Sequence, residues 1–460
     1  MTYFFETYGC QMNIAESAAV EQLLISRGWK KADDVQVADM VIINTCSVRQ
    51  TAENRIFGRL GWFTGLKALR EKRPGAKSKT LDLAAEYVKD EAKPLTLIVM
   101  GCMAERLLKS LKKDYPVVDY VVGTYAKKQF GDIISAVENK INPKDLKLVN
   151  DPDAYEFSSV SLEPGAFSAF VPIMHGCNNF CTYCIVPYVR GREKSRSTDD
   201  ILKEIDFLSK NGVKEITLLG QNVNSYNYNG TDFPALLDLI CSHIEQTKSC
   251  IGWIRFMSSH PKDLSEKLID VISSRKQLCH HIHLPVQHGS TKVLREMNRR
   301  YTREDYIALV KKIREKINDV SLTTDIMVGF PGETEEDFNE VLSLMNTILY
   351  ENAFMYYYNP REGTPAAVRN DQIDVEEKKN RLQKVIDLQL EITRREMEKR
   401  VGTVAEVLAE NVSRDDKNEL LGKTAQDERV AFAAPENLIG SFVKVKLESL
   451  SGNTFRGVLV

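Results

Sequence analysis

The sequence predicts an α/β protein with three parts: an N-terminal domain built on a parallel sheet, a central partial (β/α)6 barrel and a small C-terminal all-β barrel. Three observations support this fold class. Apolar strand-like runs alternate with helix-like segments through the first 125 residues or so, six more such runs follow, and short alternating strands with glycine turns begin after Gly402. The predicted boundaries are residues 1–138, a linker at 139–167, then 168–400 and 401–460.

The composition is that of an ordinary globular chain. Hydrophobic residues make up 43% of the 460 residues and charged residues 27%, which allows a sizeable core. The formal net charge is −2, so the overall charge does not indicate a nucleic-acid partner and any basic surface must be local. No apolar run approaches the roughly 18 residues that span a membrane, and the first residues lack the regions of a signal peptide. We therefore expect a cytoplasmic protein without a membrane partner.

Three strand-like runs of the N-terminal part end in the same way. "YFFETYGCQMN" leads to Cys10, "ADMVIINTCSVR" to Cys46 and "LTLIVMGCMAER" to Cys102. Because the carboxyl ends of parallel strands meet at one edge of a sheet, we expect these cysteines to share a site there. The alternative is three small buried residues, since free cysteine is common in cores. The charged stretch 66–94, which follows Cys46, is expected to be a surface excursion.

The central part supplies six strand candidates, and a long amphipathic helix is expected over residues 375–400. The strand candidates are "SAFVPIMHG", "EITLLGQN", "GWIRFMS", "HHIHLPVQ", "SLTTDIMVGFPG" and "NAFMYYYNP". Their number favours an open barrel over a complete eightfold one.

A loop in the central part carries three more cysteines, Cys177, Cys181 and Cys184, within "HGCNNFCTYCIVPY". Three thiolates at this spacing can hold three irons of a [4Fe–4S] cluster and leave the fourth iron free for a small molecule. Zinc is the competing metal, with His175 as a fourth ligand, although structural zinc sites are usually closed by four well-spaced ligands. The nine cysteines of the chain, in a reducing compartment, argue against a disulfide framework.

The spacing "CNNFCTYC" resembles the C-x₃-C-x₂-C signature of the radical S-adenosylmethionine (SAM) superfamily. The resemblance implies that the open iron binds SAM and that the cluster cleaves it to a radical. It also suggests SAM-binding roles for residues near the later strand ends, whose alternative is simply a polar strand end. These candidates are Tyr183, Gly220, Gln221, Asn222, Arg255, Ser258, His283 and Gln287.

Nearly the whole chain resembles the methylthiotransferases, which join an N-terminal cysteine domain, a radical SAM barrel and a C-terminal β-barrel called TRAM. "TYGCQMN", "NTCSVR" and "GCMAER" carry the N-terminal part of the resemblance. It implies that Cys10, Cys46 and Cys102 hold a second, auxiliary [4Fe–4S] cluster that carries the donated sulfur. SAM would then act as methyl donor and radical source, with no catalytic side chain beyond the two clusters. An electron donor such as flavodoxin or ferredoxin and a sulfur source are implied as partners, and we expect a monomer.

The substrate is inferred from two segments. "YNPREGTPAA" resembles the segment of family members that modify N6-isopentenyladenosine beside the tRNA anticodon, which suggests the anticodon stem-loop as partner and contacts from Tyr358, Arg361 and Thr364. The basic run "VPYVRGREKSRS" adds phosphate contacts from Arg190, Arg192 and Arg196, unless it is a solvated or salt-bridged face. The alternatives are family members that act on threonylcarbamoyladenosine or on an aspartate of a ribosomal protein, a non-catalytic metal-stabilised RNA-binding protein, and an electron-transfer protein.

Other chemistry-bearing residues are given structural roles. Cys241, Cys250 and Cys279 lack ligand spacing and are expected to be buried or incidental. In "CHHIH", strand alternation puts His281 and His283 on one face and His280 on the other, which favours a polar stripe over a metal site. His288 stands where the family commonly has serine.

Overall fold

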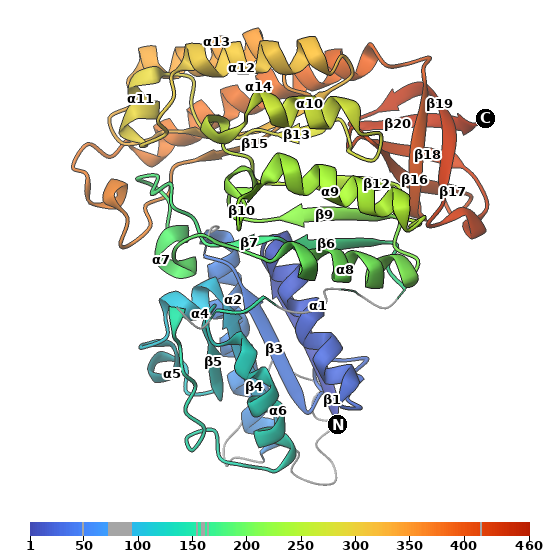
Figure 1. The fold of residues 1–460 in the computed structure, drawn as a ribbon. Coiled ribbons are helices and arrows are strands. Elements are labelled where there is room, and N and C mark those ends of the chain that lie inside the picture. The colour runs from blue at the N-terminus through green and yellow to red at the C-terminus, as the bar shows by residue number, and fades with distance from the viewer. Residues whose placement is uncertain (48–49, 72–93, 153–154, 158–161, 163–164, 415) are drawn as a thin grey trace. The chain divides into compact units, whose positions relative to one another are not determined.

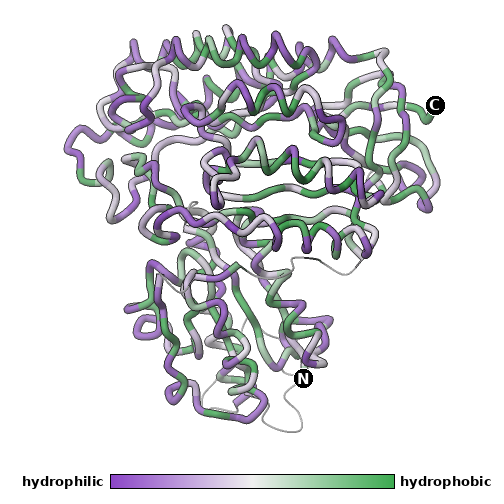
Figure 2. The backbone as a smooth tube through the Cα atoms, viewed as in Figure 1, coloured by the Kyte–Doolittle hydropathy of each residue, from purple (hydrophilic) through white to green (hydrophobic). Residues whose placement is uncertain are grey.

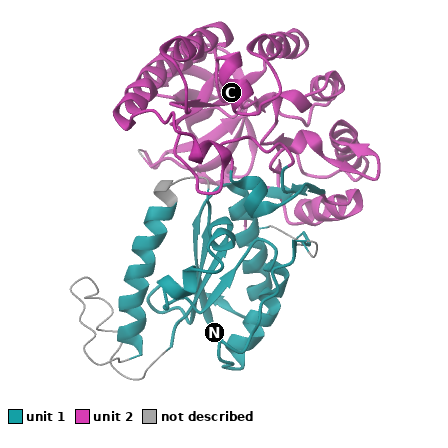
Figure 3. Cartoon of the chain, turned by 90° about the vertical axis from the view of Figure 1, so that its left-hand side faces the viewer, with its two compact units in different colours: residues 1–164, 170–177, 185–194 teal, residues 165–169, 178–184, 195–460 magenta. Residues whose placement is uncertain are grey.

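The computed structural model describes residues 1–47, 50–71, 94–152, 155–157, 162, 165–414 and 416–460. Its contacts divide the chain into two compact units (Figure 3). The first unit comprises residues 1–164, 170–177 and 185–194, and the second comprises 165–169, 178–184 and 195–460. The boundary falls twice within the three-cysteine loop, so Cys177 belongs to the first unit and Cys181 and Cys184 to the second.

The first unit is built on a five-stranded parallel sheet with the strand order β2-β1-β3-β4-β5 (Figure 1). The strands are β1 (Thr2–Tyr8), β2 (Lys30–Lys31), β3 (Met40–Thr45), β4 (Thr96–Gly101) and β5 (Tyr120–Val122). In the pairing register Tyr8 lies opposite Thr45, and Thr45 lies opposite Gly101. The three predicted strands are therefore confirmed, and they end level with one another.

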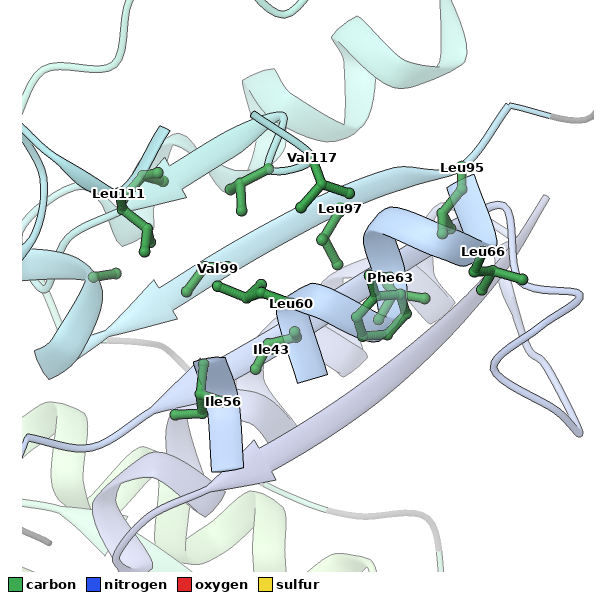
Figure 4. Close-up of a cluster of buried hydrophobic side chains, with 14 of the residues drawn as sticks. Ile43, Ile56, Leu60, Phe63, Leu66, Leu95, Leu97, Val99, Leu111 and Val117 are labelled. Carbon is green, nitrogen blue, oxygen red and sulfur yellow. The ribbon is translucent and has the colours of Figure 1, made fainter. Parts of the chain in front are cut away.

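Every residue of β3 is buried, although a strand sends alternate side chains to opposite faces of its sheet. Both faces of this sheet are therefore covered, and helices cover them. Helix α2 (Gln50–Arg70) packs on one face, where Ile56, Leu60, Phe63 and Leu66 meet Ile43, Leu97 and Val99 (Figure 4). Helices α1 (Gln11–Ser26) and α6 (Phe130–Glu138) pack on the other face. Most of the predicted 66–94 excursion lies outside the described residues, and its first residues continue α2.

All six strands that the sequence predicts for the central part are present; five lie in the second unit, and β6 crosses the boundary between the units at residues 169 and 170. The six strands are β6 (Ser168–Pro172), β9 (Glu215–Leu219), β12 (Trp253–Phe256), β13 (His281–His283), β14 (Ser321–Val328) and β15 (Asn352–Tyr357). They form two three-stranded sheets with orders β12-β9-β6 and β13-β14-β15, joined by an isolated bridge between Ile254 and Leu278. The alternating helices are α8 (Thr198–Lys210), α9 (Phe233–Gln246), α10 (Glu266–Ser274), α11 (Thr291–Glu296), α12 (Arg303–Lys316) and α13 (Glu335–Ile348).

The C-terminal part of the second unit is a closed five-stranded barrel, which confirms the predicted all-β fold. The predicted long helix is α14 (Val375–Glu398), and the barrel strands are β16 (Val404–Val412), β17 (Glu419–Thr424), β18 (Arg429–Ala433), β19 (Phe442–Ser451) and β20 (Thr454–Leu459). Neighbouring strands approach so closely that a Cβ on Gly422 would lie 2.4 Å from the Leu408 carbonyl oxygen. The hydropathy-coloured tube shows apolar positions recurring along these strands (Figure 2).

Among the described residues, no helix combines the length and the apolar character that crossing a membrane requires.

Candidate functional site

The three cysteines that follow strands of the first unit come together at one edge of its sheet. Cys10 caps the start of α1, Cys46 directly follows β3, and Cys102 is the first residue of α4 (Cys102–Arg106). Cys10 and Cys46 are hydrogen-bonded to one another, and the thiolate charge of Cys10 acts on Cys102. The strand register places the three cysteines at the same edge of the sheet, whereas a shared site and their role as cluster ligands stay predictions.

Two asparagines hold the loops that carry these cysteines. The Asn13 side-chain amide donates hydrogen bonds to the Asn44 side-chain oxygen at 2.9 Å and to the Thr45 carbonyl at 3.1 Å. The Cys10 backbone amide donates to the Asn13 Oδ1 at 3.2 Å. Gly101 has φ +95°, and a Cβ there would lie 2.5 Å from the Asn44 Oδ1. The sequence reading missed both asparagines, although "CQMN" and "NTC" place each beside a cysteine.

The thiols differ in how readily they ionise. The hydrogen bond with Cys46 lowers the pKa of Cys10 to about 6, although burial opposes it, and the charge of Arg190 acts in the same direction as the hydrogen bond. Burial raises the pKa of Cys102 despite the nearby Arg190. Within the described part of the chain no three such side chains crowd around a single point as one metal ion would require. Three converging thiols fit a multi-iron cluster, which spaces its ligands over separate corners.

Arg190 lies directly against this cysteine set. Its Nε donates to the Cys102 Sγ at 3.1 Å, and its Nη1 donates to the Glu16 Oε1 at 2.8 Å. Lys127 pairs with the same carboxylate. Arg190 is only 3% exposed, and its guanidinium binds Glu16 and Cys102. The expected phosphate contact of Arg190 is therefore corrected.

His175 lies beneath the same arginine. Its Nδ1 is 3.5 Å from the Arg190 Nη1, and the Tyr155 ring stacks on the imidazole at a centroid distance of 3.8 Å. Burial, and then the positive charge of Arg190, lower the pKa of His175, so the ring is neutral at physiological pH. Its Nε2 is buried without a hydrogen-bond partner. The imidazole therefore belongs to the surroundings of the Cys10, Cys46 and Cys102 site.

In the second unit, the segment Met297–Arg300 holds the part of the three-cysteine loop that carries Cys181 and Cys184. The Asn298 amide donates to the carbonyls of Asn179 and Phe180, both at 3.1 Å. The backbone amide of Thr182 donates to the Met297 carbonyl at 3.1 Å. Asn298 and Arg300 both have positive φ, so this segment is a tight, specific turn. The sequence reading missed this segment.

Arg299 of the same segment points at a cysteine. Its Nη1 donates to the Cys181 Sγ at 3.5 Å, its Nη2 to the Pro285 carbonyl at 2.7 Å and its Nε to the Tyr301 hydroxyl at 2.9 Å. Arg299 is 4% exposed, and no carboxylate in the described ranges forms an ion pair with it. A buried cation without a carboxylate partner fits an anionic group such as a cluster held by three thiolates.

The loops after β9 and β12 form a polar cradle. The Ser258 carbonyl accepts from the Val223 amide at 3.2 Å, and the Asn222 Oδ1 accepts from the His260 amide at 3.2 Å. Several buried polar atoms here have no hydrogen-bond partner: Gln221 Oε1, both side-chain polar atoms of Asn224, Ser259 Oγ and His260 Nε2. Orphaned buried groups are costly, so their clustering fits a polar ligand such as SAM.

The predicted SAM-binding residues in this cradle differ in whether their polar atoms already have partners. Gly220, Gln221, Asn222 and Ser258 all follow carboxyl strand ends, but the Asn222 amide is already bonded to Asp263 at 2.7 Å. Asn224, Ser259 and His260 were missed by the sequence reading and carry unpartnered atoms. Their position after β9 and β12 could have identified them, because both segments were already predicted as strands.

Three further SAM candidates lie elsewhere in the second unit. The His283 Nδ1 contacts the Thr323 hydroxyl at 3.0 Å, and Thr323 also contacts His281 at 3.0 Å, which confirms the one-face stripe. The Gln287 Oε1 accepts from the Tyr356 hydroxyl at 2.7 Å, and Gln287 has a φ of +72°. Tyr183 packs into an apolar cluster with Met297 and Met327. Their SAM roles remain predictions.

The expected SAM contact of Arg255 is wrong. This residue lies within β12, not after it, and its Nε donates to the Glu215 carboxylate at 2.7 Å. Its Nη2 and Nη1 donate to the carbonyls of Thr424 at 2.7 Å and Ala425 at 2.8 Å in the C-terminal barrel. Glu215 is the first residue of β9, so Arg255 faces the end of the strands opposite the cradle. It ties the barrel to the sheet.

Other substrate candidates have internal partners. Arg196 is buried and forms an ion pair with Glu204, so its expected phosphate contact is corrected. Tyr358 is 1% exposed and packs against Phe330, and the Thr364 hydroxyl donates to the Arg361 carbonyl at 2.7 Å. The expected direct contacts of Tyr358 and Thr364 with a substrate are therefore also corrected. These two residues shape the segment instead. Arg192 is exposed and Arg361 is partly exposed, and both remain candidates.

The remaining residues flagged in the sequence have structural roles. Cys241 and Cys279 are buried, as expected, and His280 pairs with Asp319. The His288 Nδ1 accepts from the Ser290 amide at 2.9 Å, so its Nε2 carries the proton and donates to Glu333 at 3.2 Å. His288 thus stabilises the turn that follows β14.

Family models match most of the chain. The radical SAM superfamily model matches residues 171–345, and the model of an uncharacterized family, UPF0004, matches residues 2–123. Solved structures share the fold: a radical S-adenosylmethionine methyltransferase from Kitasatospora setae, TsrM, aligns with a TM-score of 0.58 at 12% identity, covering 80% of this chain and 75% of the other. Fold and match together define a radical SAM protein.

Curated relatives narrow the class. A protein of Treponema denticola named tRNA-2-methylthio-N(6)-dimethylallyladenosine synthase is 48% identical over 474 residues, which cover 100% of both chains. A protein of the same name from Carboxydothermus hydrogenoformans is 42% identical, covering 100% of this chain and 99% of the other. The chain belongs to the radical SAM methylthiotransferase family and is a transferase.

Proposed function

We propose that this chain installs a methylthio group at C2 of N6-isopentenyladenosine beside the anticodon of tRNA, using two [4Fe–4S] clusters and SAM. The observation that carries the proposal is full-length identity of 48% to a relative named for this modification. It is supported by the sheet register, which places Cys10, Cys46 and Cys102 at the same edge. The proposal assigns the auxiliary cluster to these three residues and the SAM-binding cluster to Cys177, Cys181 and Cys184.

When bound, the clusters and SAM supply the radical, the sulfur and the methyl group that replacing an aromatic C–H bond requires. The protein contributes thiolates, orientation and protection from water. The low pKa of Cys10, about 6, means that one ligand of the first set is already ionised at neutral pH. Ile185 and Val189 pack against Cys102 and keep water from that side of the site.

In the second unit the cradle beyond β9 and β12 receives SAM. Gln221, Asn224 and Ser259 offer it hydrogen bonds that the chain itself does not use. Asn298 fixes the backbone between Asn179 and Phe180, which positions Cys181 relative to this cradle. Arg299 holds the Cys181 sulfur and provides positive charge for the cluster.

Substrate binding is assigned to the exposed Arg192 and the partly exposed Arg361, and the turn Gly363–Pro365 shapes the surroundings of Arg361. Pro365 begins a short 3₁₀ helix, η5 (Pro365–Val368), and its ring fixes the turn that follows Thr364. The C-terminal barrel is proposed as an additional contact for tRNA. Lys423 does not serve that contact, because it pairs with Glu215 at 2.9 Å and with Glu410 at 3.2 Å.

The test is a nucleoside analysis of tRNA from a bacterial strain that lacks this activity and carries either the wild-type chain or Cys10→Ala. Wild type is expected to restore methylthio-isopentenyladenosine, whereas Cys10→Ala leaves isopentenyladenosine unmodified at C2. If methylthio-threonylcarbamoyladenosine appears instead, the substrate is the other modified adenosine. If a ribosomal protein gains the methylthio group and tRNA does not, the tRNA proposal is wrong.

A further inference from the structure

The partners of Arg190 point to a role beyond binding substrate. Its side chain is 3% exposed and that of Glu16 is 5% exposed. Its Nε lies 3.1 Å from the Cys102 Sγ, within hydrogen-bond reach of a sulfur acceptor. The polar contacts of the Arg190 side chain among the described residues lie within the first unit, to Cys102, Glu16 and His175. This arginine is therefore committed to one cysteine sulfur.

The network behind Arg190 holds it in that position. Glu16 lies on α1, which Cys10 caps, and accepts from Arg190 at 2.8 Å. Lys127 pairs with the same Glu16 carboxylate, which therefore faces two cations. Because Glu16 anchors the Nη1 side of the guanidinium, the Nε is left to point at Cys102. Residues 16, 127 and 190 are brought together only by the fold.

A charge-assisted hydrogen bond to a ligating sulfur stabilises the more reduced, more negative state of a cluster. We infer that Arg190 is a positioning residue that raises the reduction potential of the auxiliary cluster by donating from Nε to the Cys102 sulfur, with Glu16 holding it in place and partly offsetting its charge. The inference rests on the proposed function, since it needs a cluster on Cys10, Cys46 and Cys102. It assigns no proton transfer and no contact with substrate to Arg190.

The charges give two variants with opposite expected effects. Arg190→Gln removes the cation and the charge-assisted hydrogen bond, so the cluster becomes harder to reduce. Glu16→Gln keeps Arg190 but removes the carboxylate that offsets it, so the cluster becomes easier to reduce. A purely structural role predicts no such opposition, because both changes disturb the same network.

The experiment uses the full chain with Cys177, Cys181 and Cys184 replaced by alanine and reconstituted anaerobically with iron and sulfide. Potentiometric titration followed by electron paramagnetic resonance reports the auxiliary cluster alone. Arg190→Gln is expected to lower its one-electron equilibrium constant for reduction at least tenfold, which corresponds to 59 mV. Glu16→Gln is expected to shift the potential in the opposite direction, and Arg190→Lys should give an intermediate value because lysine keeps the charge without the planar fork.

Arg27→Gln is the matched control, because Arg27 pairs with Glu138 just beyond the far end of α1 and its loss should leave the potential unchanged. If the parent chain binds no iron, the auxiliary-cluster assignment fails, and this inference fails with it. If iron binds but Arg190→Gln leaves the potential unchanged, or both variants shift it in the same direction, the inference alone is overturned. Loss of iron from every variant of Arg190 and Glu16 would assign the network to structure and would also overturn it.

Discussion

The first unit pairs its cysteine-bound arginine with a carboxylate, whereas the described residues of the second unit place no carboxylate in an ion pair with theirs. Arg190 lies 3.1 Å from the Cys102 sulfur and 2.8 Å from Glu16. Arg299 lies 3.5 Å from the Cys181 sulfur, and it also donates hydrogen bonds to the Pro285 carbonyl and the Tyr301 hydroxyl. A compensated cation costs little to keep buried in the empty protein, while an uncompensated one is stabilised chiefly by the anion that it awaits.

This difference suggests distinct tasks for the two sets of thiols. The set in the first unit lies beside Arg190 and Lys127, whose positive charge the Glu16 carboxylate offsets in part before any metal is inserted. The second unit, which carries Cys181 and Cys184, also holds unpartnered polar atoms of Gln221, Asn224 and Ser259, which a cofactor would satisfy. The first arrangement favours storage of a tightly held group, and the second favours a ligand that arrives and leaves.

The largest expected effect is on the number of irons that each set of three cysteines binds. A reconstituted wild-type chain should hold about eight irons, and Cys10→Ala or Cys181→Ala should each reduce this to about four. Cys10→Ala should still form 5′-deoxyadenosine from SAM under reducing conditions, because the loop cysteines are intact, whereas Cys181→Ala should not. Iron assay and chromatography of the nucleoside measure both. Equal loss of SAM cleavage in the two variants would contradict two separate sites.

The next effect concerns the uncompensated arginine. Arg299→Gln should speed the loss of iron from the cluster on Cys177, Cys181 and Cys184. The expected change in rate is about 10- to 100-fold, the size of effect that mutating the partners of metal ligands usually has. Release of iron to a chelator is measured in a Cys10→Ala background, which leaves only this cluster. Arg275→Gln is the matched control, since Arg275 pairs with Asp238 at a partly exposed position of the same unit. An unchanged release rate would remove Arg299 from the cluster's surroundings.

A third variant tests whether Arg255 belongs to the site or to the scaffold. Arg255→Gln leaves the two barrel carbonyls and part of Glu215 without their donor, so the free energy of unfolding should fall by about 2–4 kcal/mol. SAM cleavage by the folded fraction should not change. Urea unfolding followed by circular dichroism, with turnover per folded molecule, distinguishes these outcomes. A loss of SAM affinity at unchanged stability would restore the role expected from sequence.

The strands and the cysteine edge could be predicted from sequence because periodicity and a parallel sheet determine them. Three apolar runs, each followed by a cysteine, leave only one edge at which Cys10, Cys46 and Cys102 can meet. Directions of side chains within a strand were harder to predict. Arg255 was given a SAM-binding role because the segment near this strand end resembles a SAM-binding element of the family. Glu215 and Thr424, which decide its orientation, are distant in the sequence.

The arginine networks were not predictable for the same physical reason. Glu16 and Arg190 are 174 positions apart, and the basic run around Arg190 looks like a solvated surface until that carboxylate is placed beside it. Asn298 and Arg300 were overlooked because left-handed backbone at a non-glycine residue has only a weak sequence signal. Local patterns reveal which chemistry is available, and long-range pairing decides where each charge is used.

The smallest effect is the acid response of the compensated site. Burial raises the pKa of Glu16, but the charges of Arg190 and Lys127 outweigh it and lower the pKa from an ordinary 4.5 to about 2. A depressed carboxyl pKa contributes stability above the unfolded value, and that contribution is lost as the pH falls from about 4.5 toward 2. Between pH 6 and pH 3.5 the metal-free protein should therefore lose about 1 kcal/mol of protection through this group, and Glu16→Gln should not show that loss.

Hydrogen exchange of the α1 amides, corrected for the intrinsic rate at each pH, measures this protection locally, because Glu16 lies within that helix. Glu391→Gln on α14 is the control, since Glu391 has no ion pair among the described residues and should leave α1 unchanged. In the part of the second unit that the structure describes, no carboxylate forms an ion pair with Arg299, so its loop should show no matching acid step. A loss of protection of the same size in both units would contradict the comparison. It would mean that the charges of both arginines are offset to the same degree, and that the two sites differ only in their ligands.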